Sequence, residues 1–342
     1  MRTAEFEFRV PERLIPSRPR ELRGGRRGDA RLVVLDRARE RIEHAQFRDL
    51  KSWLDEGDAL VVNNSLVMHD RLAGECADGK VSLILFGQHP DGWLAQVSPA
   101  RQARRGRVIR IGGGEVRAVL LRPDADDLWV VRFAFEGDFH DVLQRFGRRH
   151  AAALQDLSKR MQSYRNVYAT EPGSLEVPSA GLHFTHAILA GLRAKGVDIV
   201  PITLHIGLSE AYRHVSARDV EDHEVGREWF RVNAAAARAL NAATRRGGRL
   251  VAVGTTSTRT LETVARRGKP FRAREGWSDL YIRPGYRYKA VDAMLTNLHQ
   301  PRSSHLMLVA AFAGKDFTLA AYREIVRKQY RFDLFGDCML IV

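Results

Sequence analysis

Cysteine is scarce in this chain of 342 residues, which contains only Cys76 and Cys338. Two thiols are too few for a disulfide framework or a zinc cluster, so we expect reduced, structural side chains in a cytoplasmic protein. Long apolar runs are also missing, because the longest, Leu306 to Ala313, is far shorter than the roughly 20 residues of a membrane-spanning helix. The first residues, MRTAEFEFRVPERL, hold no apolar segment, so we expect neither a secretory signal nor a membrane partner.

Lysine is the other scarce residue, since it supplies 8 of the 55 basic side chains and arginine supplies the remaining 47. The formal net charge is +14, and hydrophobic residues make up 44% of the chain. This balance is typical of a globular protein and excludes collagen-like and mainly disordered chains. A basic field attracts polyanions such as nucleic acids. An arginine bias can equally follow from genomic composition, so charge alone leaves both interpretations open.

The pattern of the chain changes twice along its length. Residues 66–147 hold short alternating runs such as VSLILFG and EVRAVLL, separated by glycine- and proline-rich turns, which is typical of a small antiparallel β-barrel. Residues 1–65 and 148–342 alternate strands with helices, which favours a mostly parallel sheet. We therefore predict an α/β fold, in which a large mixed α/β domain (1–65 and 148–342) carries an inserted antiparallel β-barrel domain (66–147).

Local patterns also predict individual elements. Thr185 and Asn233 are expected to cap helices, and the loop from Arg18 to Arg27 is expected to be mobile or ordered by a ligand. We predict strands at 31–35, 59–62, 197–204 and 249–253, and helices at 47–56, 139–162, 187–195, 234–245, 258–266 and 316–328.

The sharpest local signal is RLVAVGTTSTRTLETV, from Arg249 to Val264. An apolar strand ends at Gly254, and the hydroxyls of Thr255, Thr256 and Ser257 lead into a helix. Free amides at a helix start form a site for anions, and ligands collect at the carboxyl ends of strands in α/β sheets. The alternative is that Ser257 only caps the helix. The motif is not a P-loop, because the Gly-Lys-Ser/Thr ending is missing.

Histidines and acidic residues gather in four further motifs. His183 lies in VPSAGLHFTHAIL before a helix, and His205 ends the apolar strand of ITLHIGL. Both are expected to serve chemistry, although an ordinary hydrogen-bonded histidine is the alternative. The other two motifs are VEDHEVGREWF, with Asp222 and His223, and MLTNLHQPRSSHLML, with Asn297, His299 and Arg302. We expect no metal site, since no HExxH, CxxC or paired-carboxylate spacing occurs.

Taken together, these motifs resemble the S-adenosylmethionine:tRNA ribosyltransferase-isomerases of queuosine biosynthesis over nearly the whole chain. Further matching segments are FRDLKSWLDEGDALVVNN, NVYATEPGSLEVPSAGLHFT and GWSDLYIRPGYRYKAVDAMLTNLHQPRSSHLMLVAAFAG. The resemblance implies a large α/β domain with an inserted β-barrel. It also implies transfer and isomerisation of the ribosyl part of S-adenosylmethionine onto 7-aminomethyl-7-deazaguanine in tRNA, giving epoxyqueuosine and releasing adenine and methionine. No metal or other cofactor is implied beyond S-adenosylmethionine as co-substrate.

This chemistry matches the residue types in the motifs. A sulfonium acidifies the neighbouring ribose carbon, and histidine or carboxylate groups transfer protons near neutral pH. For proton transfer or polar positioning we select His183, His205, Asp222, His223 and His299. For anchoring the substrate we select Thr255, Thr256, Ser257, Arg259, Asn297 and Arg302. Phosphates of tRNA are expected along the Arg18 to Arg27 loop and along Arg101, Arg104, Arg105 and Arg107.

The chain departs from the family pattern in three expected pocket loops. The 146–164 segment lacks the usual prolines, Ser209 to Tyr212 replaces Gly-Thr-Phe, and Glu224 to Glu228 replaces Arg-Met-His-Ser-Glu. Altered loops on a kept scaffold leave two alternatives open. One is a paralogue that uses S-adenosylmethionine with a non-tRNA small-molecule acceptor, and the other is a non-catalytic S-adenosylmethionine-binding protein.

Overall fold

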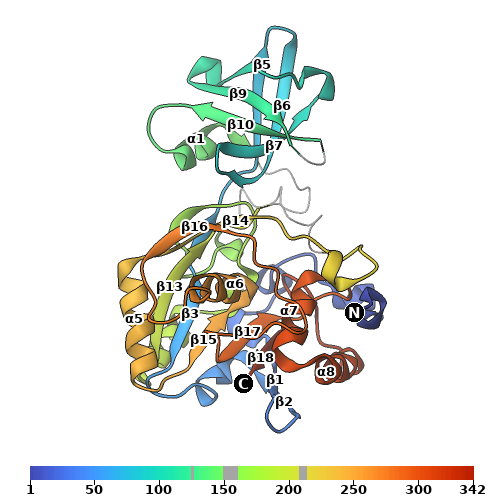
Figure 1. Ribbon diagram of the computed structural model, residues 1–342, viewed down its shortest axis with the longest axis vertical. Coiled ribbons are helices and arrows are strands. Elements are labelled where there is room, and N and C mark those ends of the chain that lie inside the picture. Colours follow the sequence, from blue (N-terminus) through green and yellow to red (C-terminus); the bar gives the residue numbers. More distant parts are fainter. Residues whose placement is uncertain (125–126, 149–160, 208–213) are drawn as a thin grey trace.

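The computed structural model describes residues 1–124, 127–148, 161–207 and 214–342, which form two parts (Figure 1). The larger part is built on a nine-stranded sheet of order β16-β14-β13-β3-β15-β17-β18-β1-β2. The smaller part is an antiparallel sheet of order β11-β5-β6-β7-β10-β9-β8, closed into a barrel by a contact between β5 and β8. The predicted mixed α/β fold with an antiparallel β-barrel is confirmed.

Four neighbouring strands at the centre of the large sheet run parallel. They are β13 (Asp198–Leu204), β3 (Ala59–Asn63), β15 (Leu250–Val253) and β17 (Ala293–Asn297). Their carboxyl ends therefore share one edge of the sheet. Antiparallel pairs flank them, so the sheet as a whole is mixed rather than mostly parallel. The flanking strands are β14 (Glu228–Val232), β16 (Arg274–Ser278), β18 (Cys338–Ile341), β1 (Arg31–Asp36) and β2 (Arg41–Gln46).

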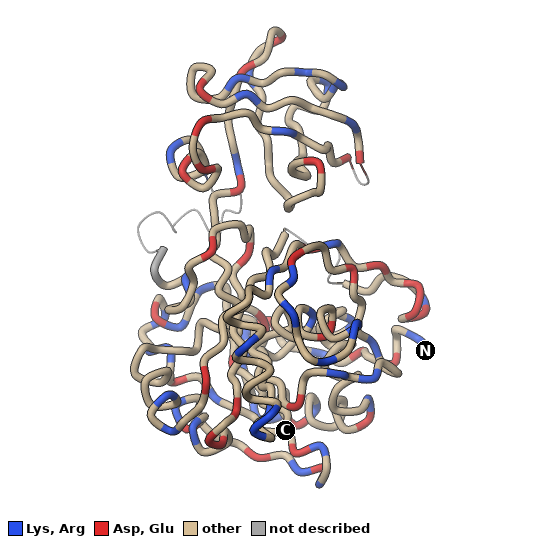
Figure 2. Tube along the Cα trace, turned by 60° about the vertical axis from the view of Figure 1, so that its left-hand side comes forward, with Lys and Arg blue, Asp and Glu red and all other residues tan. Residues whose placement is uncertain are grey.

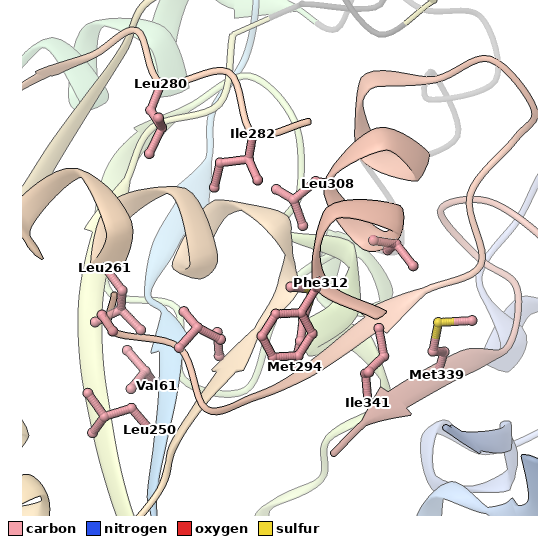
Figure 3. Packing of buried hydrophobic residues seen from close by; sticks show 14 of the residues in the cluster. Val61, Leu250, Leu261, Leu280, Ile282, Met294, Leu308, Phe312, Met339 and Ile341 are labelled. Carbon is pink, nitrogen blue, oxygen red and sulfur yellow. The ribbon is translucent and has the colours of Figure 1, made fainter. Parts of the chain in front are cut away.

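Helices cover both faces of this sheet, because successive strand residues point to opposite sides. Val61 packs into one core and its neighbour Leu60 into the other. The first core, shown in Figure 3, is covered by α5 (Ala234–Arg245), α6 (Gly254–Ala265), α7 (Ser304–Ala313) and α8 (Lys315–Arg327). The second is covered by α3 (His186–Ala194) and the 3₁₀ helices η5 (Phe47–Ser52) and η10 (Ser179–His183). No helix in the described part of the chain combines the length and apolar character needed to cross a bilayer.

The barrel closes through a close approach at Gly74. A Cβ atom there would lie 2.6 Å from the carbonyl oxygen of Arg110, so only glycine lets β8 pair with β5. The strands are β5 (Arg71–Cys76), β6 (Gly79–His89), β7 (Gly92–Ser98), β8 (Val108–Ile111), β9 (Val116–Pro123), β10 (Leu128–Ala134) and the short β11 (Gly147–Arg148), with helix α1 (Phe139–Phe146) before β11.

A small parallel ladder of β4 (Ser65–Val67) and β12 (Glu171–Ser174) belongs to neither sheet. It pairs the segment that precedes the barrel with a segment that follows it. The domain boundaries at residues 66 and 148 stay a prediction.

Most predicted elements are observed within a few residues. The side chains of Thr185 and Asn233 accept hydrogen bonds from the third residue beyond each, as helix caps do. Three helix predictions need correction. The segment from Phe47 is a 3₁₀ helix, α1 ends at Phe146, and α6 begins at Gly254 instead of residue 258. Residues 149–160 of the predicted 139–162 helix lie outside the described part.

The loop from Arg18 to Arg27, which is expected to be mobile or ordered by a ligand, contacts the α/β part through its arginines. Arg20 Nη2 lies 2.6 Å from Asp337 Oδ1, and Arg23 Nη2 donates to the carbonyl of Phe335 at 2.8 Å. Arg27 pairs with Glu21 at 2.5 Å. These guanidinium groups already have protein partners, so they contribute little to a surface for phosphates.

Candidate functional site

A cleft opens at the shared carboxyl edge of β3, β13, β15 and β17, where α/β sheets commonly bind ligands. We call it the edge cleft. Its walls come from segments far apart in sequence, and no single motif would indicate all of them. They are residues 177–180, Ile206, 225–226, Glu228, 253–256, Arg259, 280–282, 296–297, His299, 304–305, Leu308 and 333–334.

The start of α6 forms one wall of the edge cleft. Gly254 has a φ of 83°, a left-handed conformation that lets the chain turn from β15 directly into the helix. Val253 at the N-cap offers no side-chain hydrogen bond, so no cap competes for the first amides of α6 beside Thr255 and Thr256. Thr256 Oγ1 also accepts a hydrogen bond from Asn63 Nδ2 at 3.2 Å. This wall therefore suits an anionic ligand group.

Ser257 differs from the two threonines before it. It lies inside α6, is fully buried and does not line the edge cleft. Its Oγ has no hydrogen-bond partner among the described residues. The alternative that Ser257 caps the helix is wrong, because the helix begins three residues earlier.

Asn297, at the end of β17, ties three segments together at the floor of the edge cleft. Its Nδ2 donates to the carbonyls of Asp333 and Leu334, each at 3.0 Å. Its Oδ1 therefore accepts from His183 Nε2, 3.0 Å away, which fixes the protonated nitrogen of that imidazole. His183 is behind Asn297 and does not itself line the edge cleft.

His205 is held in a similarly enclosed place. Its Nδ1 lies 2.7 Å from Ser65 Oγ, which in turn lies 2.7 Å from Ser174 Oγ. Its ring stacks on Trp229, with centroids 5.0 Å apart and an interplanar angle of 13°. Burial lowers the pKa of both His205 and His183 to about 4, so both imidazoles are neutral near pH 7. Neutral, hydrogen-bonded rings of this kind position other groups better than they accept protons.

Arg259 and Glu228 form an ion pair on the wall of the edge cleft. Arg259 Nε also donates to the carbonyl of Leu280 at 3.1 Å. The charge of Arg259 is thus matched within the protein, and the pair presents a polar, nearly neutral wall.

Two neighbouring histidines form another wall of the edge cleft. His299 and His305 line the edge cleft with ring centroids 5.0 Å apart, and His299 Nε2 is hydrogen-bonded to Thr296 Oγ1 at 2.9 Å. His305 was missed at the sequence level, because it falls within the apolar start of α7. Asp333 was missed as well, since only the fold brings it to the edge cleft.

Besides Ser257, His183 and His205, three further selected residues do not line the edge cleft. Asp222 is exposed in the 3₁₀ helix η11 (Val220–Asp222). His223 packs on Tyr281, a lining residue, at 5.3 Å between ring centroids, so it lies at the rim. Arg302 Nε lies 3.8 Å from a carboxylate oxygen of Glu7. Five of the eleven selected residues line the edge cleft, namely Thr255, Thr256, Arg259, Asn297 and His299.

Known proteins resemble this chain over its whole length. The model of the family described as "Queuosine biosynthesis protein" matches residues 3–341. Proteins named S-adenosylmethionine:tRNA ribosyltransferase-isomerase from Symbiobacterium thermophilum and Caldanaerobacter subterraneus are 43% and 40% identical, each with 100% of both chains covered. A crystal structure of S-adenosylmethionine tRNA ribosyltransferase from Thermotoga maritima is 34% identical, with a TM-score of 0.56, and the match covers 99% of this chain and 100% of that one.

Proposed function

The chain belongs to the queuosine biosynthesis protein family, and on that premise we propose that it is an S-adenosylmethionine:tRNA ribosyltransferase-isomerase. The observation that carries the proposal is the full-length identity of 40–43% to proteins of that name. The enzyme transfers the ribosyl group of S-adenosylmethionine to 7-aminomethyl-7-deazaguanine in tRNA and isomerises it, which gives epoxyqueuosine, adenine and methionine. We propose the cytoplasm as its location and no cofactor or metal beyond the co-substrate.

S-adenosylmethionine fits the edge cleft on chemical grounds. The amides at the start of α6, beside Thr255 and Thr256, suit the methionine carboxylate. Apolar side chains such as Val177, Leu280 and Ile282 line the same space and suit the adenine ring. The Arg259–Glu228 pair adds no net charge that would repel the sulfonium.

Proton transfer needs a group that reaches the ribose carbon beside the sulfonium. Of the histidines selected from the sequence, only His299 lines the edge cleft. Its Nε2 is fixed by Thr296 Oγ1, so the ring has a defined orientation. We assign proton transfer to His299, and positioning roles to His183, through Asn297, and to His205, through Ser65.

The tRNA needs a basic surface, and the whole-chain charge does not supply one by itself. Figure 2 shows basic and acidic residues interleaved over both parts of the molecule. Arg107 of the selected barrel group pairs with Asp78 at 2.5 Å, whereas Arg101, Arg104 and Arg105 are exposed. A second basic group lines a concave face of the barrel, and none of its members has a carboxylate within ion-pair distance among the described residues. This group consists of Arg71, Lys80, Arg110 and Arg148, and we call the concave face that these four residues line the barrel groove.

Neutralising the barrel groove should weaken tRNA binding and its salt dependence. Each phosphate contact releases counterions, so replacing all four side chains with Gln should lower the slope of log Kd against log salt by about 3. Filter binding of tRNA between 50 and about 300 mM salt measures the slope. The matched control replaces four exposed cations near the carboxyl ends of α5 and α6, namely Arg245, Arg267, Lys269 and Arg272. Equal slopes in both variants would show that tRNA responds to net charge and not to the groove.

The reaction itself is tested by incubating the protein with S-adenosylmethionine and tRNA that carries the 7-deazaguanine precursor. We expect epoxyqueuosine in the digested tRNA, together with adenine and methionine in equal amounts, measured by mass spectrometry. Release of adenine and methionine without tRNA would instead support a small-molecule acceptor. Binding of S-adenosylmethionine in calorimetry without turnover on any acceptor would support a non-catalytic protein.

A further inference from the structure

We propose that the acceptor base leaves its RNA stack and docks on an aromatic platform between the barrel and the large sheet, beside the edge cleft. The aromatic platform consists of Trp229, Trp277 and His205. This inference rests on the proposed function and adds to it the place and chemistry of the second substrate. A cavity separate from the edge cleft carries it, lined by residues 86–90, Leu94, Asp124, Leu128, His205, Gly207, 226–229 and Trp277.

The strand register explains why the platform exists. Trp229 of β14 and Trp277 of β16 are direct partners in an antiparallel pair, so their side chains lie on the same face. The next residue, Phe230, points the other way and is fully buried in the first core. The ring of His205 stacks on Trp229, and Ser65 holds His205 in place. The result is a stacked pair of rings, His205 on Trp229, with Trp277 on the same face of the strand pair.

The barrel supplies the facing wall. Phe86, Pro90 and Leu94 line the cavity from β6, β7 and the turn between them. The two parts touch at Gly87 of the barrel and Gly207 of the large part. A Cβ atom on Gly207 would lie 2.5 Å from the carbonyl oxygen of Phe86, and a Cβ atom on Gly87 would lie 3.5 Å from the Cα atom of Gly207. Flat rings on one side and apolar side chains on the other suit a planar heteroaromatic ligand.

The cavity also adjoins the edge cleft. Gly226 and Glu228 line both spaces, so a base on the platform would lie next to a ribosyl donor in the edge cleft. The acceptor carries an aminomethyl group, which is a cation in neutral water. Asp124 places a carboxylate at the cavity, Arg227 lines it as well, and the carboxylate of Glu228 is paired with Arg259, so the lining is close to neutral. The tryptophan rings themselves attract cations. The flat aromatic lining and the continuity with the edge cleft therefore favour a planar base, and the tryptophan faces favour one that bears an amine.

Enzymes that do chemistry on a nucleobase act on single-stranded nucleic acid or extrude the base from its stack. Aromatic side chains offset the lost stacking, and each such contact changes affinity by about tenfold to a hundredfold. The competing explanation is that the platform only fastens the barrel to the sheet. In that case removing a platform side chain would lower the folding stability but would not weaken binding of the acceptor base.

The test compares Trp277→Ala with Trp277→Phe and with Trp129→Ala. Trp129 lies in β10 of the barrel and does not line the cavity, so it controls for the loss of a partly buried tryptophan. We expect Trp277→Ala to raise the KM for precursor tRNA by about tenfold to a hundredfold, while calorimetry shows an unchanged Kd for S-adenosylmethionine. Trp277→Phe and Trp129→Ala should stay within about threefold of wild type.

A second variant and a second measurement distinguish unfolding of Trp277→Ala, failure of the proposed function and failure of this inference. Leu94→Arg, which introduces a cation from the barrel wall, should raise KM to a similar extent even if Trp277→Ala unfolds. Free 7-aminomethyl-7-deazaguanine should quench the tryptophan fluorescence of the wild type, and less that of Trp277→Ala. Quenching without product formation would overturn the proposed function and keep this inference. Product formation with unchanged KM in Trp277→Ala and Leu94→Arg would overturn the inference alone.

Discussion

Lowering the pH from 7 to 4.5 should remove roughly 5 kcal/mol of folding free energy through His183 and His205 alone. Burial lowers the pKa of each imidazole from 6.5 to about 4. Between these two values the unfolded chain binds protons on both histidines and the folded chain does not, so acid favours unfolding. The folding free energy linked to the two neutral imidazoles is fully present above pH 6.5 and is lost as the pH falls towards 4. Urea unfolding at several pH values measures it.

The histidine variants provide the control for other acid-sensitive groups. His205→Gln should be less stable at pH 7 but should lose about half as much of the acid-dependent term as the wild type. The matched control is His186→Gln, which removes an exposed histidine on α3. A His205→Gln profile parallel to that of the wild type would contradict the assignment of a buried, neutral His205.

Replacing His299 with Gln should lower kcat by about a hundredfold or more, the usual scale of lost acid–base catalysis. Glutamine keeps a polar group near Thr296 but cannot carry the proton, so the Kd for S-adenosylmethionine should stay within about threefold. Single-turnover release of adenine measures the chemical step, and calorimetry measures binding. His186→Gln is again the matched control. Near-normal turnover in His299→Gln would remove this residue from proton transfer.

His183→Gln is expected to act differently. His183 reaches the edge cleft only through Asn297, whose amide also holds the carbonyls of Asp333 and Leu334. Its loss should therefore weaken both folding stability and ligand binding. This contrast with His299 separates positioning from proton transfer.

Local chemistry made much of the fold predictable. The caps at Thr185 and Asn233 depend on residues three positions apart, and the barrel pattern depends on alternation within short runs. The start of α6 was placed four residues too late, because the helix begins at a glycine in a left-handed conformation and not at a hydroxyl cap.

The candidate site was only partly predictable, because its walls meet through tertiary packing. The motifs located Thr255, Asn297 and His299 at the edge of the sheet. His305 lies in the motif from Met294 to Leu308 but was not selected, because it falls in the apolar start of α7. Asp333 belongs to none of the motifs, and only the fold brings it to the edge cleft after α8. The altered loop from Ser209 to Tyr212 and most of the 146–164 segment lie outside the described residues, and their effect on the acceptor stays a prediction.

The closing contact at Gly74 has a consequence for aggregation. A closed barrel exposes few unpaired strand edges, and unpaired edges are where a second chain can add itself. The large sheet does end in two edge strands, but β2 carries Arg41 and Glu43, and β16 carries Arg274 and Glu275. Because charged side chains discourage further pairing, neither edge offers a second molecule a flat apolar template, even when the protein is concentrated.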